Sequence, residues 1–212
     1  MKIAVFGANG GIGKWVVKYA LERGYDVTAC VRRMPSQPLS TSDKLRVVVV
    51  NTDDNRKMEE ILRDCTAVIN CIGVSMRPFH EDKAAVQANS DIISAMKIAG
   101  VKRYITWATP SIRSDEDRRS VITVVPGIMA SIFLPQAKRC IKQIISDVVN
   151  SDLQWTVVRF MAPKDTAPSG EVKVSFGERK IKFNISRADI ASFMVSQVEN
   201  NEYIDRMPII GC

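Results

Sequence analysis

Short apolar runs alternate with segments of helical periodicity along most of the chain. The apolar runs predict buried strands over residues 2–6, 26–31, 45–50, 66–72, 101–109 and 154–160. Between them, apolar residues spaced three and four apart predict helices over residues 12–23, 56–63, 81–99 and 136–149. Strands separated by helices of this length favour right-handed crossovers. The pattern therefore predicts an α/β fold of three layers, in which helices cover both faces of a parallel sheet.

The rhythm of the chain changes after the last of these strands. Residues 171–176 and 180–183 alternate apolar and polar side chains, which is typical of the two arms of a hairpin. Two further elements follow, an amphipathic helix over residues 188–198 and a final strand within residues 204–210. We expect the hairpin and its loops, mainly residues 160–185, to form a small cap over the substrate site. We treat residues 1–212 as a single domain, because the C-terminal part is too short for a core of its own.

The composition is that of an ordinary globular protein, with 46% hydrophobic and 25% charged residues. No apolar run approaches the length of a membrane helix, and the first residues lack the features of a signal peptide. The net charge of +7 favours an anionic ligand, but no basic stripe with interleaved aromatics indicates nucleic acid. Five cysteines without a C-x-x-C pair indicate reduced thiols. We expect a cytoplasmic protein, a monomer or weak dimer, without a membrane or nucleic-acid partner.

A glycine-rich turn stands directly after the first predicted strand and opens the first helix. Gly7, Gly10 and Gly13 are spaced three apart in the segment Gly-Ala-Asn-Gly-Gly-Ile-Gly. Small residues here let the backbone approach a pyrophosphate, and the amide groups and the positive end of the helix neutralise that anion. The segment therefore predicts a dinucleotide site. The alternative is an ordinary turn between a strand and a helix.

Arg32 and Arg33 end the second predicted strand, where a dinucleotide site of this kind commonly has an acidic residue. A carboxylate binds the free 2′-hydroxyl of NAD and repels a 2′-phosphate, whereas guanidinium groups do the reverse. The pair therefore predicts that NADP(H) is preferred over NAD(H). The alternative is two solvated arginines on the surface.

Polar or small residues also follow the third and fourth predicted strands. Asn51 and Thr52 could reach the adenine edge of the cofactor, and Cys71, Ile72 and Gly73 stand where the backbone could approach its ribose. Both segments lie at the carboxyl ends of strands, where open α/β sheets bind ligands. Ordinary loop chemistry explains them equally well.

Five segments that span nearly the whole chain resemble a known family. They are K-I-A-V-F-G-A-N-G-G-I-G at residue 2, V-T-A-C-V-R-R at 27, A-G-V-K-R-Y-I at 99, L-Q-W-T-V-V-R at 153 and I-S-R-A-D-I-A-S-F-M at 185. Their order and spacing resemble the atypical short-chain dehydrogenase/reductases, specifically the NmrA-like NAD(P)H-binding group with its biliverdin reductase B and flavin reductase-like members. The resemblance implies a Rossmann-like fold, NADP(H), and hydride transfer to a flavin, a biliverdin-like tetrapyrrole or a quinone.

The resemblance also implies roles for individual residues. The segments described above and the resemblance together give the residues expected to contact the cofactor: Gly7, Asn9, Gly10, Gly11, Ile12, Gly13, Arg32, Arg33, Asn51, Thr52, Cys71, Ile72, Gly73, Thr109 and Phe160. The aspartate that the family has after strand three is replaced here by the stretch Asn51–Thr52. The hydroxyl at the end of strand five falls on Thr109, where relatives usually carry serine, and Ser111 is the second candidate for the catalytic hydroxyl. Relatives generally have arginine–proline after strand six. This chain has Arg159–Phe160 instead, which leaves the substrate open.

The catalytic Tyr-x-x-x-Lys pair of ordinary short-chain dehydrogenases is absent, because none of the four tyrosines has lysine four residues later. His80 is the only histidine, so neither a Ser/His/Asp triad nor a multi-histidine metal site is expected. The remaining chemistry suits a conjugated acceptor that needs little acid help. Candidates for an apolar wall of its pocket are Trp107, Phe133, Phe160 and Met161, and core packing is the alternative for each of them. The alternative is a catalytically silent, NmrA-like NADP(H)-binding regulatory protein. An isomerase or epimerase has less support, since no proton shuttle is recognisable.

Overall fold

The computed structural model describes residues 1–77 and 80–212. Within them the strands are β1 (Lys2–Phe6), β2 (Asp26–Val31), β3 (Leu45–Val49), β4 (Ala67–Asn70), β5 (Arg103–Ala108), β6 (Gln154–Arg159), β7 (Lys173–Ser175) and β8 (Ile209–Gly211). The helices are α1 (Gly13–Glu22), α2 (Asn55–Leu62), α3 (Lys83–Ala99), α4 (Val121–Phe133), α5 (Pro135–Val149) and α6 (Arg187–Ser196).

All eight of these strands form one sheet, in the order β3-β2-β1-β4-β5-β6-β8-β7. Every pair is parallel except β7 with β8, which is antiparallel. The chain runs outward from β1 to β3 and then returns to the other side of β1 with β4. This reversal places a crevice between the carboxyl ends of β1 and β4, where sheets of this kind bind ligands.

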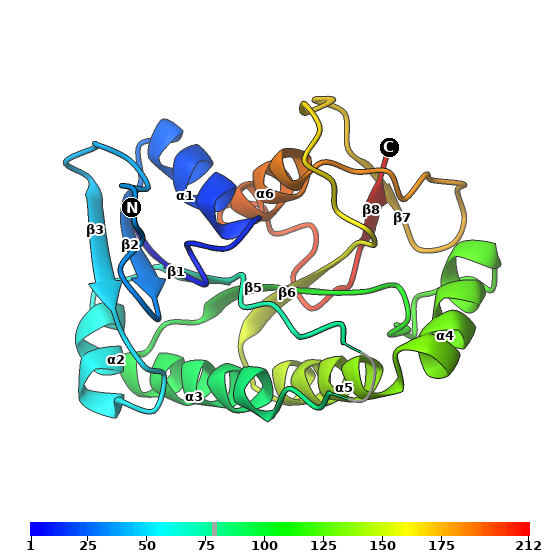
Figure 1. Cartoon of the computed structure of the whole chain (residues 1–212), viewed down its shortest axis with the longest axis horizontal. Coiled ribbons are helices and arrows are strands. Elements are labelled where there is room, and N and C mark those ends of the chain that lie inside the picture. The colour runs from blue at the N-terminus through cyan, green and yellow to red at the C-terminus, as the bar shows by residue number, and fades with distance from the viewer. Residues whose placement is uncertain (78–79) are drawn as a thin grey trace.

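Helices cover both faces of the sheet (Figure 1). α1 and α6 pack together on one face, and α2, α3 and α5 form a row on the other. The alternation of side chains along each strand feeds the two cores. In β1, Ile3 and Val5 face the α1 and α6 side, whereas Ala4 and Phe6 face the other. The predicted Rossmann-like, three-layer α/β fold is confirmed.

The predicted hairpin is wrong. β7 pairs with β8 at the edge of the main sheet, and residues 180–183 form no strand. Lys182 instead exchanges two backbone hydrogen bonds of 3.0 Å with Cys212. Both arms of the alternating pattern therefore pair with the C-terminal segment rather than with each other.

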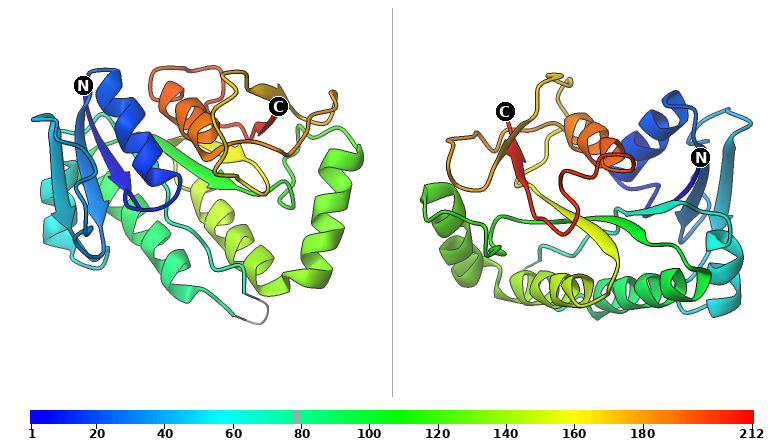
Figure 2. Two further views of the ribbon diagram at one scale, coloured as in Figure 1. Left: turned by 45° about the horizontal axis from the view of Figure 1, so that its top comes forward. Right: turned by 180° about the vertical axis from the view of Figure 1, so that it is seen from behind.

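Helix α4 is an element that the sequence pattern did not predict. Ser120 and Thr123 form a capping box at its start, and Pro126 lies inside it. The helix stands beside the start of α5 at one end of the molecule (Figure 2). No described helix is long and apolar enough to cross a membrane.

Candidate functional site

The glycine turn lies at the crevice between β1 and β4. Gly7 has a φ of +70°, and a Cβ there would lie 2.7 Å from the carbonyl carbon of Cys71. A Cβ at Gly13 would collide with the carbonyl oxygen of Gly7. Gly7 therefore has both a backbone and a packing requirement for glycine, and Gly13 lets α1 begin directly against the turn.

Several backbone N–H groups of this turn have no hydrogen-bond acceptor in the backbone that the structure describes. In the described residues, the N–H groups of Gly11, Ile12 and Gly13 donate to no backbone acceptor, and α1 has no side-chain cap or acidic residue in its first turn. Three neighbouring amides and an uncapped positive helix end attract an anion. Together with the close-packed glycines, they fit the pyrophosphate of a dinucleotide.

A mostly apolar cavity of about 580 Å³ opens beside the turn. Predicted site residues that line it are Gly10, Gly11, Ile12, Cys71, Gly73, Thr109, Ser111 and Phe160. Trp107, Phe133 and Met161, the other proposed wall residues, line it as well. The structure thus brings the glycine turn, the end of β5 and the end of β6 to one cavity.

The remaining predicted residues do not line the cavity. They are Gly7, Asn9, Gly13, Arg32, Arg33, Asn51, Thr52 and Ile72. Gly7 and Gly13 allow the close backbone packing of the turn, and Asn9 is exposed on the turn. The carbonyl of Ile72 accepts a hydrogen bond from Trp107 Nε1 at 2.9 Å, so Ile72 orients the wall.

Arg32 and Arg33 directly follow β2 and are exposed. β2 runs beside β1, with Cys30 opposite Phe6 and Ala8 N–H donating to Cys30 O at 3.3 Å. The two arginines therefore stand at the same edge of the sheet as the glycine turn. In the described part of the chain neither side chain has a hydrogen-bonding or ionic partner.

Asn51 and Thr52 occupy the corresponding place after β3. Asn51 is exposed and its carbonyl accepts from Asp54 N–H at 3.2 Å, while Thr52 is half-buried. The Asn51 contact belongs to the turn that starts α2. The strand order puts these residues beyond Arg32, at the outer part of the edge.

The two candidate hydroxyl groups contact each other. Thr109 Oγ1 lies 2.6 Å from Ser111 Oγ, and both residues line the cavity where β5 ends. Either oxygen can donate in this pair, so one hydroxyl remains free to bond a ligand. The two alternatives from the sequence therefore form one unit.

Two aromatic rings form one wall of the cavity. Trp107 and Phe160 stack with their centroids 5.7 Å apart, from the ends of β5 and β6. Phe160 is 4% exposed, and its N–H donates to Ala108 O at 3.1 Å. The wall is therefore fixed by the sheet itself.

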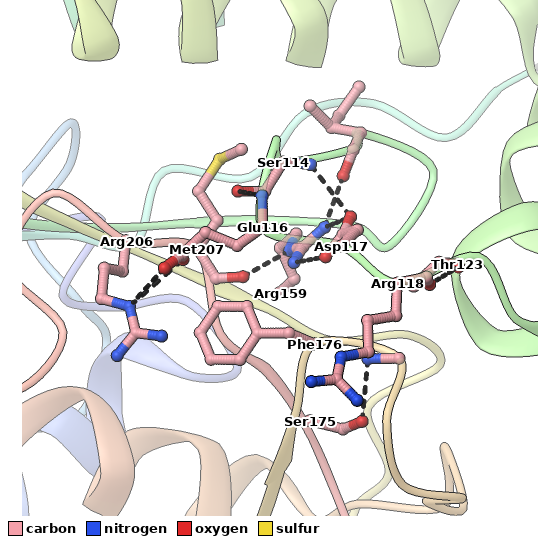
Figure 3. Close-up of polar contacts among 12 residues, drawn as sticks. Ser114, Glu116, Asp117, Arg118, Thr123, Arg159, Ser175, Phe176, Arg206 and Met207 are labelled. Carbon is pink, nitrogen blue, oxygen red and sulfur yellow. Dashed lines mark hydrogen bonds and ion pairs between the residues drawn. The ribbon is translucent and has the colours of Figure 1, made fainter.

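A buried ion pair holds the loop that carries Ser111 (Figure 3). Arg159 at the end of β6 makes two contacts of 2.6 Å with the Asp117 carboxylate, and both side chains are fully buried. Arg159 also donates to Ile112 O at 2.9 Å and to Met207 O at 2.7 Å. Sequence reasoning missed this role, because the partner lies 42 residues away along the chain.

Few acid–base groups reach the cavity. Burial raises the pKa of the Cys71 thiol to about 12, so Cys71 is no nucleophile at neutral pH. Tyr104 is buried between Asn70 and Asn89, each 2.8 Å from its hydroxyl, and His80 is exposed. Among the described residues no tyrosine or histidine lines the cavity, and no group of His, Cys, Asp or Glu could hold a metal ion.

Two charged residues on the cavity were not assigned from the sequence. Lys138 donates to Gly127 O at 2.9 Å and Ser131 Oγ at 2.7 Å, which ties α5 to α4. Arg187, the first residue of α6, lies against Gly11. Ser186, the residue before it, caps this helix, since its Oγ accepts a hydrogen bond of 2.9 Å from Asp189 N–H.

The chain is similar to known proteins in family, sequence and structure. A family model described as NAD(P)H-binding matches residues 7–201. The uncharacterized protein YwnB of Bacillus subtilis (strain 168) is 26% identical over 211 residues, which cover 96% of this chain and 94% of YwnB. Cinnamoyl-CoA reductase 1 of Arabidopsis thaliana is 31% identical over 126 residues, which cover 55% of this chain and 36% of that reductase.

Solved structures share the fold. A short-chain dehydrogenase/reductase from Veillonella parvula DSM 2008, in complex with NADP, has a TM-score of 0.78 at 14% identity and covers 100% of this chain and 94% of its own. The oxidoreductase ylbE from Lactococcus lactis has a TM-score of 0.77 at 18% identity and covers 100% of this chain and 90% of its own. At these identities the likeness establishes the fold alone.

Proposed function

The chain belongs to the NAD(P)H-binding family, and on that premise we propose that it is an NADPH-dependent oxidoreductase that transfers hydride to a flavin, a biliverdin-like tetrapyrrole or a quinone. One observation carries the proposal. A cavity with a stacked aromatic wall and a pair of hydroxyls adjoins the open amides of the glycine turn. A cofactor and a planar acceptor can therefore lie next to each other.

The cofactor side is formed by the glycine turn and the edge of the sheet. Gly10, Gly11 and Ile12 offer the backbone on which a pyrophosphate rests, and the reactive end of the cofactor then points toward Thr109 and Phe160. The nicotinamide group, when bound, supplies the hydride. The chain itself supplies position and excludes water.

Arg32 and Arg33 support a preference for NADPH. Both are exposed at the end of β2 beside the turn, and in the described residues no carboxylate neutralises them. A guanidinium binds a phosphate through paired, charge-assisted hydrogen bonds. The 2′-phosphate is the group of NADPH that NADH lacks.

The acceptor side favours a conjugated, apolar molecule. Trp107 and Phe160 offer aromatic surface against which a ring system can pack, and apolar residues of α4 together with residues 161–163 line the same cavity. The Thr109–Ser111 pair can hydrogen-bond one polar atom of the acceptor. Because no tyrosine or histidine of the described residues lines the cavity, an acceptor that draws its proton from water suits the site.

A turnover assay tests this function. The purified chain is mixed with NADPH and, in turn, FMN, menadione and biliverdin, and the loss of nicotinamide absorbance is followed against a protein-free blank. We expect turnover above the blank with at least one acceptor. Tight NADPH binding without turnover for any of them would favour the catalytically silent, regulatory alternative.

A further inference from the structure

Arg187 brings a guanidinium group against the glycine turn. A Cβ built at Gly11 would lie 2.8 Å from Arg187 Nε and 3.0 Å from its Cδ. α1 and α6 pack side by side on one face of the sheet (Figure 1), so the turn before α1 and the first residue of α6 meet. Arg187 and Gly11 line the same cavity.

The backbone of Arg187 is firmly held. Its N–H donates to Lys164 O at 2.9 Å, and Lys164 N–H donates to Ile185 O at 3.0 Å. Ser186, the preceding residue, caps α6 through a hydrogen bond of 2.9 Å from Asp189 N–H. The side chain therefore starts from a rigid base, which reduces the entropy lost when it aligns on a ligand.

The guanidinium has an exposed ionic partner. Arg187 Nη1 lies 2.6 Å from Asp165 Oδ2, and the Asp165 side chain is 73% exposed. Within residues 1–77 and 80–212, no other acceptor bonds to the Arg187 side chain. A pair with one exposed carboxylate is weak in water, and most guanidinium donors remain available for a phosphate.

We infer that Arg187 binds the pyrophosphate of the nicotinamide cofactor and exchanges its ion pair with Asp165 for that anion. The inference rests on the proposed function, because it requires the cofactor to lie on the glycine turn. Three open amides already favour an anion beside Gly11, and Arg187 adds a full positive charge at the same point.

This role differs from that of Arg32 and Arg33. The pyrophosphate is common to NADPH and NADH, so Arg187 acts on both, whereas the other two arginines act on the 2′-phosphate alone. Asp165 competes with the pyrophosphate for the same guanidinium, so it weakens the binding of both cofactors.

Calorimetric titration of the full chain with NADP⁺ and NAD⁺ tests the inference. We expect Arg187→Met to lower the affinity for both nucleotides by a similar factor of about ten or more. The loss of a hydrogen bond to a charged group reduces an affinity by about that factor. Arg187→Lys keeps the charge and retains part of the affinity. Asp165→Asn raises the affinity for both nucleotides by about two- to fivefold, because the competing ion pair that it removes is exposed and therefore weak.

The matched control is Arg63→Met. It removes the same charge at the exposed end of α2, at the side of the sheet where β4 begins rather than where the strands end. We expect it to leave both affinities unchanged. Unchanged affinities in Arg187→Met, or a loss confined to NADP⁺, would overturn the inference. If Arg187→Met fails to fold, the opposite shifts expected for Arg187→Lys and Asp165→Asn still decide it. A wild-type chain that binds neither nucleotide overturns the proposed function itself.

Discussion

At the scale of single residues, two pairs divide the proposed chemistry. In the function we propose, Arg32 and Arg33 after β2 select the cofactor, and Thr109 and Ser111 after β5 meet the acceptor. Each pair follows the end of a parallel strand, at the edge of the sheet where open α/β folds bind ligands. The two pairs can therefore be tested independently.

Replacing both Arg32 and Arg33 with alanine tests cofactor selection. We expect the affinity for NADPH to fall by at least about tenfold, because charge-assisted hydrogen bonds to the 2′-phosphate are lost. The affinity for NADH, which lacks that phosphate, should change little. Fluorescence titration with each nucleotide measures the ratio. The double variant Arg63→Ala with Lys102→Ala removes equal charge at the opposite edge and serves as the control. Equal weakening of NADPH and NADH would contradict the assignment.

Thr109→Val tests the hydroxyl pair. The change removes a hydrogen-bonding group but keeps the shape, so we expect kcat to fall by about tenfold or more while the NADPH dissociation constant stays within about twofold. Thr109→Ser keeps the hydroxyl and retains most of the activity. If Ser111→Ala costs kcat while Thr109→Val does not, Ser111 is the catalytic hydroxyl.

At the scale of elements, two buried carboxylates fix the loops around the cavity, Asp117 through an ion pair and Asp189 through hydrogen bonds. Arg159 on β6 ties down the loop after β5 through Asp117, and Asp189 on α6 ties down the segment after β6. Ser169 and Gly170 each donate a backbone N–H to the Asp189 carboxylate, at 2.9 Å and 3.1 Å. The site thus depends on contacts that join loops to a strand and a helix distant in sequence.

Asp117→Asn tests the first of these contacts. The change leaves a buried guanidinium without its counter-charge, so we expect a loss of about 3–5 kcal/mol in the free energy of unfolding, measured in urea. Glu116→Gln is the matched control. It breaks the partly exposed pair with Arg206 and should cost about 0–1 kcal/mol. Equal losses in the two variants would show that the buried pair does not anchor the loop.

The Asp189 contacts predict a dependence on pH. Burial alone would raise its pKa, but hydrogen bonds from Ser169, Ser186 and Gly170 outweigh burial and hold the pKa below the ordinary value of 3.8. The carboxylate therefore stabilises the fold fully above that value and loses its contribution as the pH falls through the lower, folded-state pKa.

Comparing the wild type with Asp189→Asn in urea at pH 7 and pH 3 measures this contribution. We expect the variant to be about 1–3 kcal/mol less stable at pH 7 and the difference to shrink at pH 3. A difference that is the same at both values, or larger at pH 3, would contradict the role of the ionised carboxylate.

The elements that sequence analysis missed have physical reasons. In α4, Pro126 and Gly127 are residues that usually break a helix, and the run without charges shows no polar face. The helix persists because Ser120 caps its start and Lys138 bonds to the carbonyl of Gly127. The hairpin was wrong because an alternating pattern tells which face of a strand is buried but does not name its partner.

At the scale of the whole molecule, the strand order of the sheet decides which distant segments meet, which local sequence patterns do not reveal. The strands up to β6, the helices between them other than α4, and the glycine turn were predictable, because each carries its own period or spacing. The pairing of Arg159 with Asp117 and the approach of Arg187 to Gly11 were not, because they depend on how distant segments meet. These contacts arise only when the sheet is complete.

A calorimetric titration of the wild-type chain with NADPH and with NADH tests cofactor binding most directly. We expect one NADPH to bind per chain, at least about tenfold more tightly than NADH, because only NADPH offers a 2′-phosphate to Arg32 and Arg33. Absence of binding heat with either nucleotide, confirmed by unchanged nicotinamide fluorescence, would contradict this expectation.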